Sequence, residues 1–171
     1  MLDCIKNRYS PRSYLNKEVE QEKIDEVISA GLRAPSGRDL QQGIVICITN
    51  KEVRNNLAKL NASIAGMPEG SDPFYGARVV LLVAHKVSPL SDLNGAAMIE
   101  NMLLEAQNQG LHARWINRGK KELETSEGKN ILKMVGLNPD EYVGVDHVIL
   151  GYSNEEPSIK EVKPNRVFYI K

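Results

Sequence analysis

Two arginines lie four residues apart near the start of the chain, in the stretch Arg8-Tyr9-Ser10-Pro11-Arg12. A guanidinium group presents forked N–H donors that match the oxygens of a phosphate, and the hydroxyl of Ser10 adds another donor. The stretch is therefore a candidate site for a small phosphate-bearing anion. An isolated pattern of this kind is more often a pair of solvated surface arginines, so both interpretations stay open at this point.

A second polar stretch, APSGRDLQQG, runs from Ala34 to Gly43 between an expected helix and an expected strand. Proline and glycine restrict its path, while Ser36, Asp39 and Gln41 offer several hydrogen-bonding groups. The segment is either an ordinary helix-to-strand connection or a loop that binds the edge of a heterocycle.

The histidines and cysteines do not form a metal-binding pattern. His85, His112 and His147 occur in no HxH or HExxH arrangement, so structural or surface roles are expected. Cys4 and Cys47 form no CxxC pair, and both are expected to be reduced thiols. Cys47 lies in the apolar run IVICIT and is predicted to be buried.

Composition limits the class of protein. The chain has 171 residues with 22 Lys and Arg against 22 Asp and Glu, and 42% of it is hydrophobic. This length and composition predict a single domain over residues 1–171, and the zero net charge argues against a nucleic-acid partner. No apolar run approaches the ~20 residues of a membrane span, and the N-terminus has no apolar signal core. A cytoplasmic protein without membrane attachment is therefore expected.

Helices and strands alternate only in part, which favours an α+β fold with a mixed sheet. Helices are predicted at 20–32, 51–60, 92–109 and 127–135. Strands are predicted at 44–49, 79–84, 112–117 and 145–152, with 167–171 as a possible fifth. The charged stretch 119–129, GKKELETSEGK, is interpreted as a solvated face.

The helix predicted at 92–109 is apolar around most of its circumference. One sheet in so small a domain cannot cover such a helix on every side. A partner subunit is the simplest cover, so the sequence favours an oligomer.

The order of these segments resembles that of the FMN-dependent nitroreductase family, especially its short members. Arg8–Arg12, an amphipathic helix, Ala34–Gln41 and a strand resemble the start of that family. Further similar segments follow in order, at 72–86 (DPFYGARVVLLVAHK), 96–118 (AAMIENMLLEAQNQGLHARWINR), 127–137 (EGKNILKMVGL) and 147–152 (HVILGY).

This resemblance implies a three-layer α+β fold, with a central mixed, mostly antiparallel sheet flanked by helices. It also implies an intertwined homodimer that holds FMN at the subunit interface. Arg8, Ser10 and Arg12 would hold the phosphate end, with backbone contacts from Tyr9. The residues that would approach the flavin from the second subunit are Pro35, Ser36, Asp39 and Gln41. Those expected beside the ring, with a backbone N–H near its N5 atom, are Ile116, Asn117 and Arg118. A basic residue near the C-terminus, Lys163 or Arg166, would complete the phosphate site.

The chain also departs from the family pattern. It has Asp39 where Asn is common, and Gln42-Gly43 where Pro-Trp or a similar pair is common. An ionised Asp only accepts hydrogen bonds, so it cannot replace every bond of Asn. His112 and Arg114 stand where the family usually has small residues.

The activity implied is that of an NADH- or NADPH-dependent oxidoreductase that reduces nitroaromatics, quinones or similar electron-poor acceptors. The flavin N5 carries the chemistry, so no protein acid or base is assigned, and two substrates sharing one face imply ping-pong kinetics. Three alternatives stay open: an FMN carrier or sensor without turnover, a related flavin reaction such as reductive dehalogenation, and an interaction module whose arginines bind an acidic partner.

Overall fold

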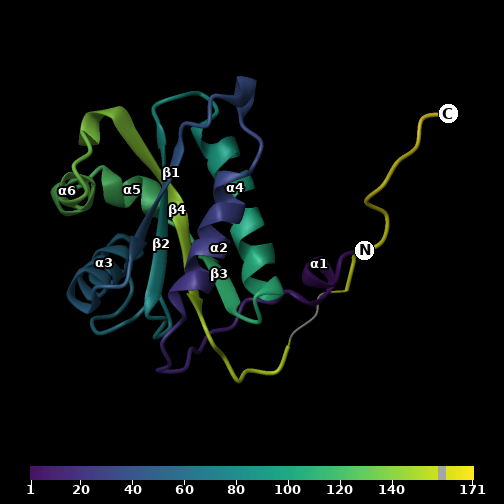
Figure 1. Ribbon diagram of the computed structural model, residues 1–171, viewed down its shortest axis with the longest axis horizontal. Coiled ribbons are helices and arrows are strands. Elements are labelled where there is room, and N and C mark those ends of the chain that lie inside the picture. The colour runs from purple at the N-terminus through teal and green to yellow at the C-terminus, as the bar shows by residue number, and fades with distance from the viewer. Residues whose placement is uncertain (158–160) are drawn as a thin grey trace.

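The computed structural model describes residues 1–157 and 161–171, and its centre is a four-stranded sheet (Figure 1). The strands are β1 (Gly43–Ile48), β2 (Val79–Lys86), β3 (His112–Ile116) and β4 (Tyr142–Gly151). Their order is β1-β2-β4-β3, and all three pairings among these described strands are antiparallel. β2 is buried at every residue except Lys86, which explains its continuous apolar sequence.

Helices cover both faces of the sheet (Figure 1). On one face lie α2 (Gln21–Leu32) and α4 (Ser91–Asn108), whose side chains form a core with Val79, Leu81 and Val83 of β2. On the other face lie α3 (Lys51–Ile64), α5 (Gly119–Leu123) and α6 (Ser126–Met134), which pack on Val80, Leu82 and Ala84. Alternate residues of β2 therefore belong to different cores, as the two-residue repeat of a strand requires.

The expected α+β architecture is confirmed, and every helix and strand predicted before residue 152 is found within a few residues of its expected limits. α3 extends four residues further than predicted. Four elements were not predicted: the short helix α1 (Asp3–Asn7), α5, and the 3-10 turns at Gly37–Asp39 (η1) and Pro139–Glu141 (η2).

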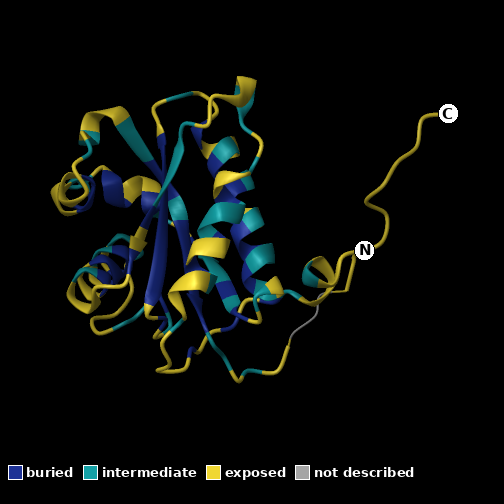
Figure 2. Cartoon of the chain, viewed as in Figure 1, coloured by how far each residue is buried: buried dark blue, intermediate teal, exposed yellow. Residues whose placement is uncertain are grey.

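The possible fifth strand at 167–171 is not formed. Residues 161–171 leave the body of the chain as an extended segment that is exposed throughout (Figures 1 and 2). We call this segment the C-terminal arm. Its apolar composition favours a strand, but the described part of this chain places no sheet edge beside it.

Two expectations about burial are wrong. Cys47 is exposed, because it lies on the edge strand β1 and on the face opposite Ile46 and Ile48. The stretch 119–129 is not simply a solvated face, because α5 turns Glu122 into the interior, where it is fully buried.

Helix α4 finds most of its cover within the chain. Met98, Ile99 and Met102 are buried against α2 and the sheet, while Leu93 is 69% exposed. A partner is therefore not required for most of this helix, and its apolar sequence alone does not establish an oligomer. None of the helices in residues 1–157 and 161–171 is both long and apolar enough to cross a membrane.

The segment that carries the N-terminal arginines is docked on the end of the sheet by specific contacts. The Tyr9 ring packs edge-on against His112 of β3, with ring centroids 5.0 Å apart. The Tyr9 hydroxyl donates to the carbonyl oxygen of Glu155 over 2.7 Å, and burial raises the pKa of this phenol, so it remains a donor at neutral pH. The backbone N–H of Arg12 donates to both oxygens of the Glu155 carboxylate, at 2.9 and 3.0 Å.

His112 gives the fold a defined pH dependence. Burial lowers the pKa of its imidazole, and its Nδ1 atom has no hydrogen-bond partner among the described residues. An unfolded chain would bind this proton below about pH 6.5. Between that pH and the lower pKa of the folded state, the unfolded chain binds more protons, so stability falls as the pH falls.

We predict that His112→Gln makes the stability of the fold less sensitive to falling pH. The melting temperature of the original chain should fall more between pH 7.5 and 5.5 than that of the variant, because only the original chain gains this proton on unfolding. Calorimetry at a series of pH values measures the difference, and curves that run parallel for the two proteins would contradict it.

Candidate functional site

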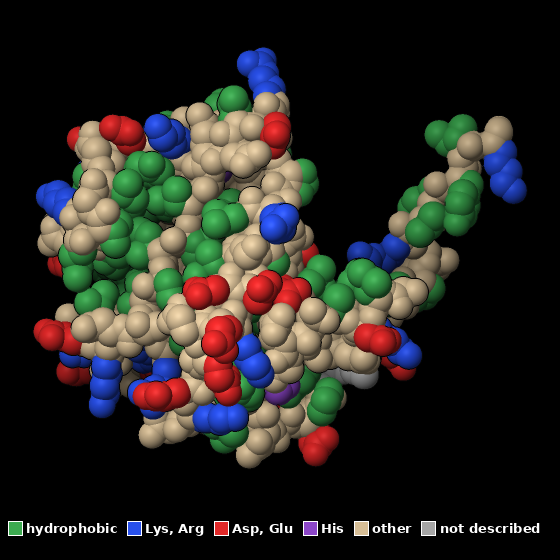
Figure 3. Space-filling view, in the orientation of Figure 1, with side chains coloured by type: hydrophobic (Ala, Val, Ile, Leu, Met, Phe, Trp, Pro, Cys, Tyr) green, Lys and Arg blue, Asp and Glu red, His purple; other side chains and the backbone are tan. Residues whose placement is uncertain are grey.

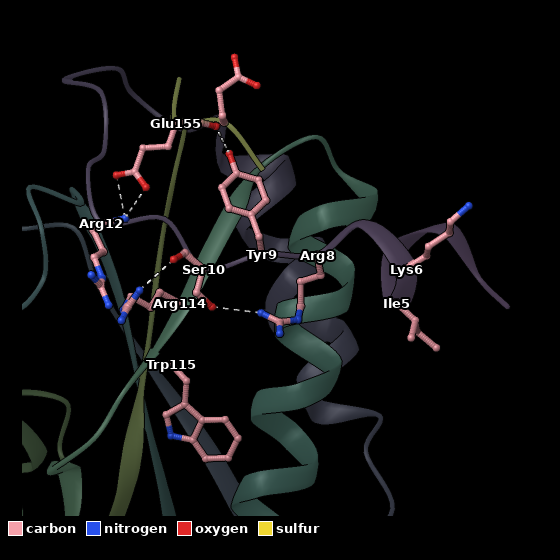
Figure 4. Close-up of a pocket in the computed structure, with 10 residues that line it drawn as sticks. Ile5, Lys6, Arg8, Tyr9, Ser10, Arg12, Arg114, Trp115 and Glu155 are labelled. Carbon is pink, nitrogen blue, oxygen red and sulfur yellow. Dashed lines mark hydrogen bonds between the residues drawn. The ribbon is translucent and has the colours of Figure 1, made fainter. Parts of the chain in front are cut away.

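A cavity of about 700 Å³ lies between the N-terminal segment and β3 (Figure 4). Its distinctive feature is a set of three arginines, Arg8 and Arg12 from the N-terminal segment and Arg114 from β3. The remaining lining residues are Ile5, Lys6, Tyr9, Ser10, Trp115, Glu155 and Glu156. The predicted residues Arg8, Tyr9, Ser10 and Arg12 are therefore brought together in one place.

Arg114 joins the two walls of this cavity. Its Nη1 atom donates to the carbonyl oxygens of Ser10 and Pro11, at 2.8 and 3.4 Å. Its guanidinium also lies 5.0 Å from the centre of the Tyr75 ring, a cation–π distance. Arg8 donates from Nη1 to the hydroxyl of Ser10 over 3.1 Å, so Ser10 is held between two arginines (Figure 4).

The guanidinium groups of these three arginine side chains have no carboxylate within ion-pair distance in the described part of the chain. The nearby Glu155 carboxylate accepts from the backbone N–H of Arg12 rather than from its side chain. The donor set consists of fork-shaped cations and a hydroxyl, which suits the oxygens of a phosphate group.

The second predicted group lies elsewhere. Pro35, Ser36 and Gln41 line a smaller cavity of about 180 Å³ near the start of α4. The Ser36 hydroxyl accepts from the backbone N–H of Gln41 at 3.0 Å, and the Gln41 amide donates to Asp39 at 3.0 Å. Figure 1 shows this loop at one end of α4 and the N-terminal segment at the other. Within one chain, the loop and the arginine cavity therefore share no residue.

This loop has a strained backbone. Arg38, Asp39 and Gln41 have φ angles of 58, 53 and 48°, in the left-handed region that non-glycine residues seldom adopt. Such conformations persist only when surrounding contacts hold them, and they occur often at binding sites.

One such contact runs through a buried histidine. The Asn94 Oδ1 atom accepts from the backbone N–H of Gly37 at 3.2 Å, and its Nδ2 lies 3.0 Å from His85 Nε2. His85 Nδ1 lies 2.7 Å from the carbonyl oxygen of Lys86, which can only accept, so Nδ1 carries the proton. His85 therefore accepts from Asn94 through Nε2, and this chain of bonds ties the loop to β2.

The third predicted group follows β3 directly. Ile116 is buried at the end of the strand, Asn117 is exposed, and Arg118 has a φ of 93°. They do not line the arginine cavity, but they continue the strand whose Arg114 and Trp115 do. Arg118 donates from Nε to Asn61 over 3.1 Å, which fixes its side chain inward.

Lys163 and Arg166 lie on the exposed C-terminal arm, and neither lines the arginine cavity. That one of these two residues contacts a phosphate stays a prediction.

Six lining residues were not among the predicted site residues: Ile5, Lys6, Arg114, Trp115, Glu155 and Glu156. Arg114 was noted only as a departure from the usual small residue. It stands two residues after His112 in a strand, so both side chains lie on the same face, and His112 meets Tyr9. The alternation of side chains along the strand HARWI places Arg114 on the same face as His112. It does not reveal which segment of the chain packs on that face.

Comparison with known proteins agrees with this geometry. The sequence profile of the nitroreductase family matches residues 5–152. A relative from Methanothermobacter thermautotrophicus, provisionally named an NADH dehydrogenase/NAD(P)H nitroreductase, is 26% identical and aligns with 98% of this chain and 85% of its own. A relative from Archaeoglobus fulgidus with the same name is 24% identical over 98% of this chain and 97% of its own.

Solved structures share the fold over nearly the whole chain. A Bacteroides fragilis nitroreductase crystallised with bound FMN superposes with a TM-score of 0.89 at 23% identity, covering 99% of this chain and 97% of that one. A Parabacteroides distasonis protein, provisionally named an NADH dehydrogenase/NAD(P)H nitroreductase, gives a TM-score of 0.76 at 27% identity over 98% and 95% of the two chains. Since the family profile extends from the segment before Arg8 to the end of β4, the chain belongs to the nitroreductase family.

Proposed function

We propose that two copies of this chain bind FMN between them and use NADH or NADPH to reduce electron-poor acceptors such as nitroaromatics or quinones. The observation that carries the proposal is the cavity with three arginines that have no carboxylate partner in the described chain. A family relative solved with FMN and relatives named NAD(P)H nitroreductases support it.

The residues of the arginine cavity fit the phosphate end of FMN. Arg8, Arg12 and Arg114 supply charge-assisted donors, and Ser10 supplies a hydroxyl that Arg8 already orients. Lys163 or Arg166 would add a further cation from a C-terminal arm. Ile116, Asn117 and Arg118 would lie beside the ring, since they extend the strand that forms one wall of the cavity.

The chemistry supplied by bound FMN is the acceptance of a hydride and the release of electrons to an acceptor. The chain's own part is to anchor the phosphate, to present backbone N–H groups to the ring, and to leave one face accessible. Reductant and acceptor then bind at that face in turn, which gives ping-pong kinetics. No side chain is required as an acid or base, because water can reach an open face.

The proposed homodimer is supported by surfaces that one chain leaves uncovered. The C-terminal arm carries Val167, Phe168 and Ile170 with 67, 87 and 104% of their surfaces exposed (Figure 3). A row of apolar residues in an extended segment is unfavourable in water, and a second copy offers the surface that the chain itself does not. The same pairing would bring Pro35, Ser36, Asp39 and Gln41 of one chain to the cavity of the other.

A second candidate function is FMN binding without turnover, as in a carrier or sensor. It is favoured by one observation: the Asp39 carboxylate, in place of the Asn amide common in the family, accepts from Gln41 and has no side-chain N–H to offer a flavin.

The proposed phosphate site predicts the effect of removing single arginines. Arg8→Ala and Arg114→Ala should each weaken FMN binding about tenfold to a hundredfold, since a hydrogen bond to a charged group contributes about 1.5–3 kcal/mol. Flavin fluorescence titration of the apoprotein measures the dissociation constant. Arg78→Ala is the matched control, because Arg78 is exposed and pairs with Glu18 outside the cavity. An original chain that remains colourless after incubation with FMN and desalting would end the proposal.

Anaerobic addition of NADH and, separately, NADPH should bleach the flavin absorbance of the holoprotein. Menadione should then restore it, because the second substrate uses the face that the first has left. Stopped-flow absorbance follows both half-reactions. Bound flavin that neither nucleotide bleaches would instead favour the carrier or sensor.

Deletion of residues 161–171 should convert a dimer into a monomer and lower FMN affinity, because the arm would no longer cover the partner. Light scattering coupled to size-exclusion chromatography measures the mass. Met134→Asp, which alters an exposed apolar residue of α6 away from the arm, is the control. An intact dimer after the deletion would contradict the role of the arm.

A further inference from the structure

Three polar side chains meet inside the protein behind the end of β3. Asn61 comes from α3, Glu122 from α5 and His147 from β4, and none of them has any exposed surface. Burying a carboxylate and an imidazole costs free energy that apolar residues of similar size would not. The family's cofactor chemistry, as proposed above, uses none of the three.

The hydrogen bonds of this cluster end on the backbone of the turn after β3. Asn61 donates from Nδ2 to Glu122 Oε1 and, over 2.9 Å, to the carbonyl oxygen of Asn117. Glu122 Oε2 lies 2.8 Å from His147 Nε2. His147 Nδ1 lies 3.3 Å from the carbonyl oxygen of Ile116. Two successive carbonyl groups are therefore bound from the protein interior.

The hydrogen-bond partners of His147 and Glu122 determine how many protons these two side chains share. The carbonyl of Ile116 can only accept, so His147 Nδ1 must carry a proton. His147 Nε2 and Glu122 Oε2 have no hydrogen-bond partner among the described residues, but they lie 2.8 Å apart as an ion-pair contact, so one proton shared between them would serve both atoms. The pair is then neutral as a whole, whichever atom holds the proton. This neutrality makes its complete burial tolerable.

Two glycines allow α5 to pack closely against its neighbours. A Cβ atom on Gly144 of β4 would collide with the carbonyl of Gly119, at the start of α5. A Cβ on Gly128 of α6 would collide with the backbone of Glu122. The two glycines allow α5 to approach β4 closely enough for Glu122 to reach His147.

Fixing the two carbonyls also fixes two N–H groups. In a planar trans peptide the N–H points opposite to the C=O of the preceding residue. The carbonyls of Ile116 and Asn117 point into the cluster, so the N–H groups of Asn117 and Arg118 point away from it. Arg118 is held at its left-handed φ of 93° with its Nε bonded to Asn61. The turn thus presents two adjacent N–H donors in fixed directions.

We propose that Asn61, Glu122 and His147 are positioning residues for the cofactor ring, acting through the backbone of residues 116–118. This inference rests on the proposed function. The hydrogen bonds, rather than the charge of Glu122, hold the turn. A glutamine at position 122 can accept from Asn61 and donate to His147 Nε2, so Glu122→Gln preserves every bond of the cluster.

The test compares Asn61→Ala with Glu122→Gln in two measurements. The first is the amide order parameters of Asn117 and Arg118 in FMN-free protein, by NMR relaxation. The second is the FMN dissociation constant. Arg54→Ala is the matched control, because Arg54 is also a buried polar residue of α3 but binds Ala77 and Asp72 instead of the turn. If Asn61→Ala does not fold, Asn61→Ser replaces it, because its hydroxyl is too short to reproduce all the hydrogen bonds of the amide but leaves one polar group in the cluster.

We expect Asn61→Ala to lower both order parameters from about 0.85 to below about 0.6, the range of flexible backbone. It should also raise the FMN dissociation constant at least tenfold. Glu122→Gln and Arg54→Ala should leave both quantities close to those of the original chain.

Two results would overturn the inference: unchanged FMN affinity in Asn61→Ala, or a loss in Glu122→Gln as large as in Asn61→Ala. If the original chain binds no FMN at all, the proposed function fails together with this inference. That outcome is distinct, because it is seen before any variant is made.

Discussion

The docking of the N-terminal segment on β3 brings Arg8 and Arg12 beside Arg114 at one cavity. Tyr9 supplies the apolar contact through His112, and Glu155 binds both the Tyr9 hydroxyl and the Arg12 backbone. Arg114 completes the attachment by donating to the carbonyl of Ser10. Because the segment is held by its backbone and by one tyrosine, the guanidinium groups of Arg8 and Arg12 remain available. The cavity depends on this arrangement, in which the backbone and Tyr9 hold the segment and the arginine side chains line the cavity.

Behind that surface the sheet is rigid for a simple reason. β2 and β4 are central strands with helices on both faces, so nearly all their side chains are buried and the register cannot slip without exposing a core. Two turns at the same end of this scaffold carry left-handed residues, at Arg38–Gln41 before β1 and at Arg118 after β3. Each turn is tied down by a buried histidine, His85 in one case and His147 in the other. The strained turns are thus bonded to side chains of the deeply buried strands β2 and β4.

Much of this could be predicted from the sequence, because the elements that carry the fold have clear periodicity. Ile24, Val27 and Ile28 mark α2, and VVLLVA marks β2, without any tertiary information. Arg8 and Arg12 were predicted to share a binding site, and they line one cavity, while their contact with a phosphate stays a prediction. Residues 167–171 were predicted as a possible strand from their local β propensity, but a strand also needs a neighbouring strand to pair with, which local sequence does not reveal.

The burial of Glu122 could not be predicted from the sequence. Glu122 stands among charged residues in a stretch of five helical residues, too short for a periodic pattern to show. Its burial depends on His147, which is distant in sequence, and on glycines that permit close approach. Arg114 was missed for a related reason. Strand alternation puts it beside His112, but only the tertiary structure shows that the N-terminal segment crosses that face.

The two halves of the predicted cofactor site lie at opposite ends of α4, so a single chain holds each half without the other. Under the proposed function, cofactor capture and subunit association are then thermodynamically linked. Dilution of the protein would release flavin, and excess flavin would hold the subunits together at concentrations where the empty chains separate. Under that linkage, the fraction of chains in the assembled form rises with the concentration of free flavin.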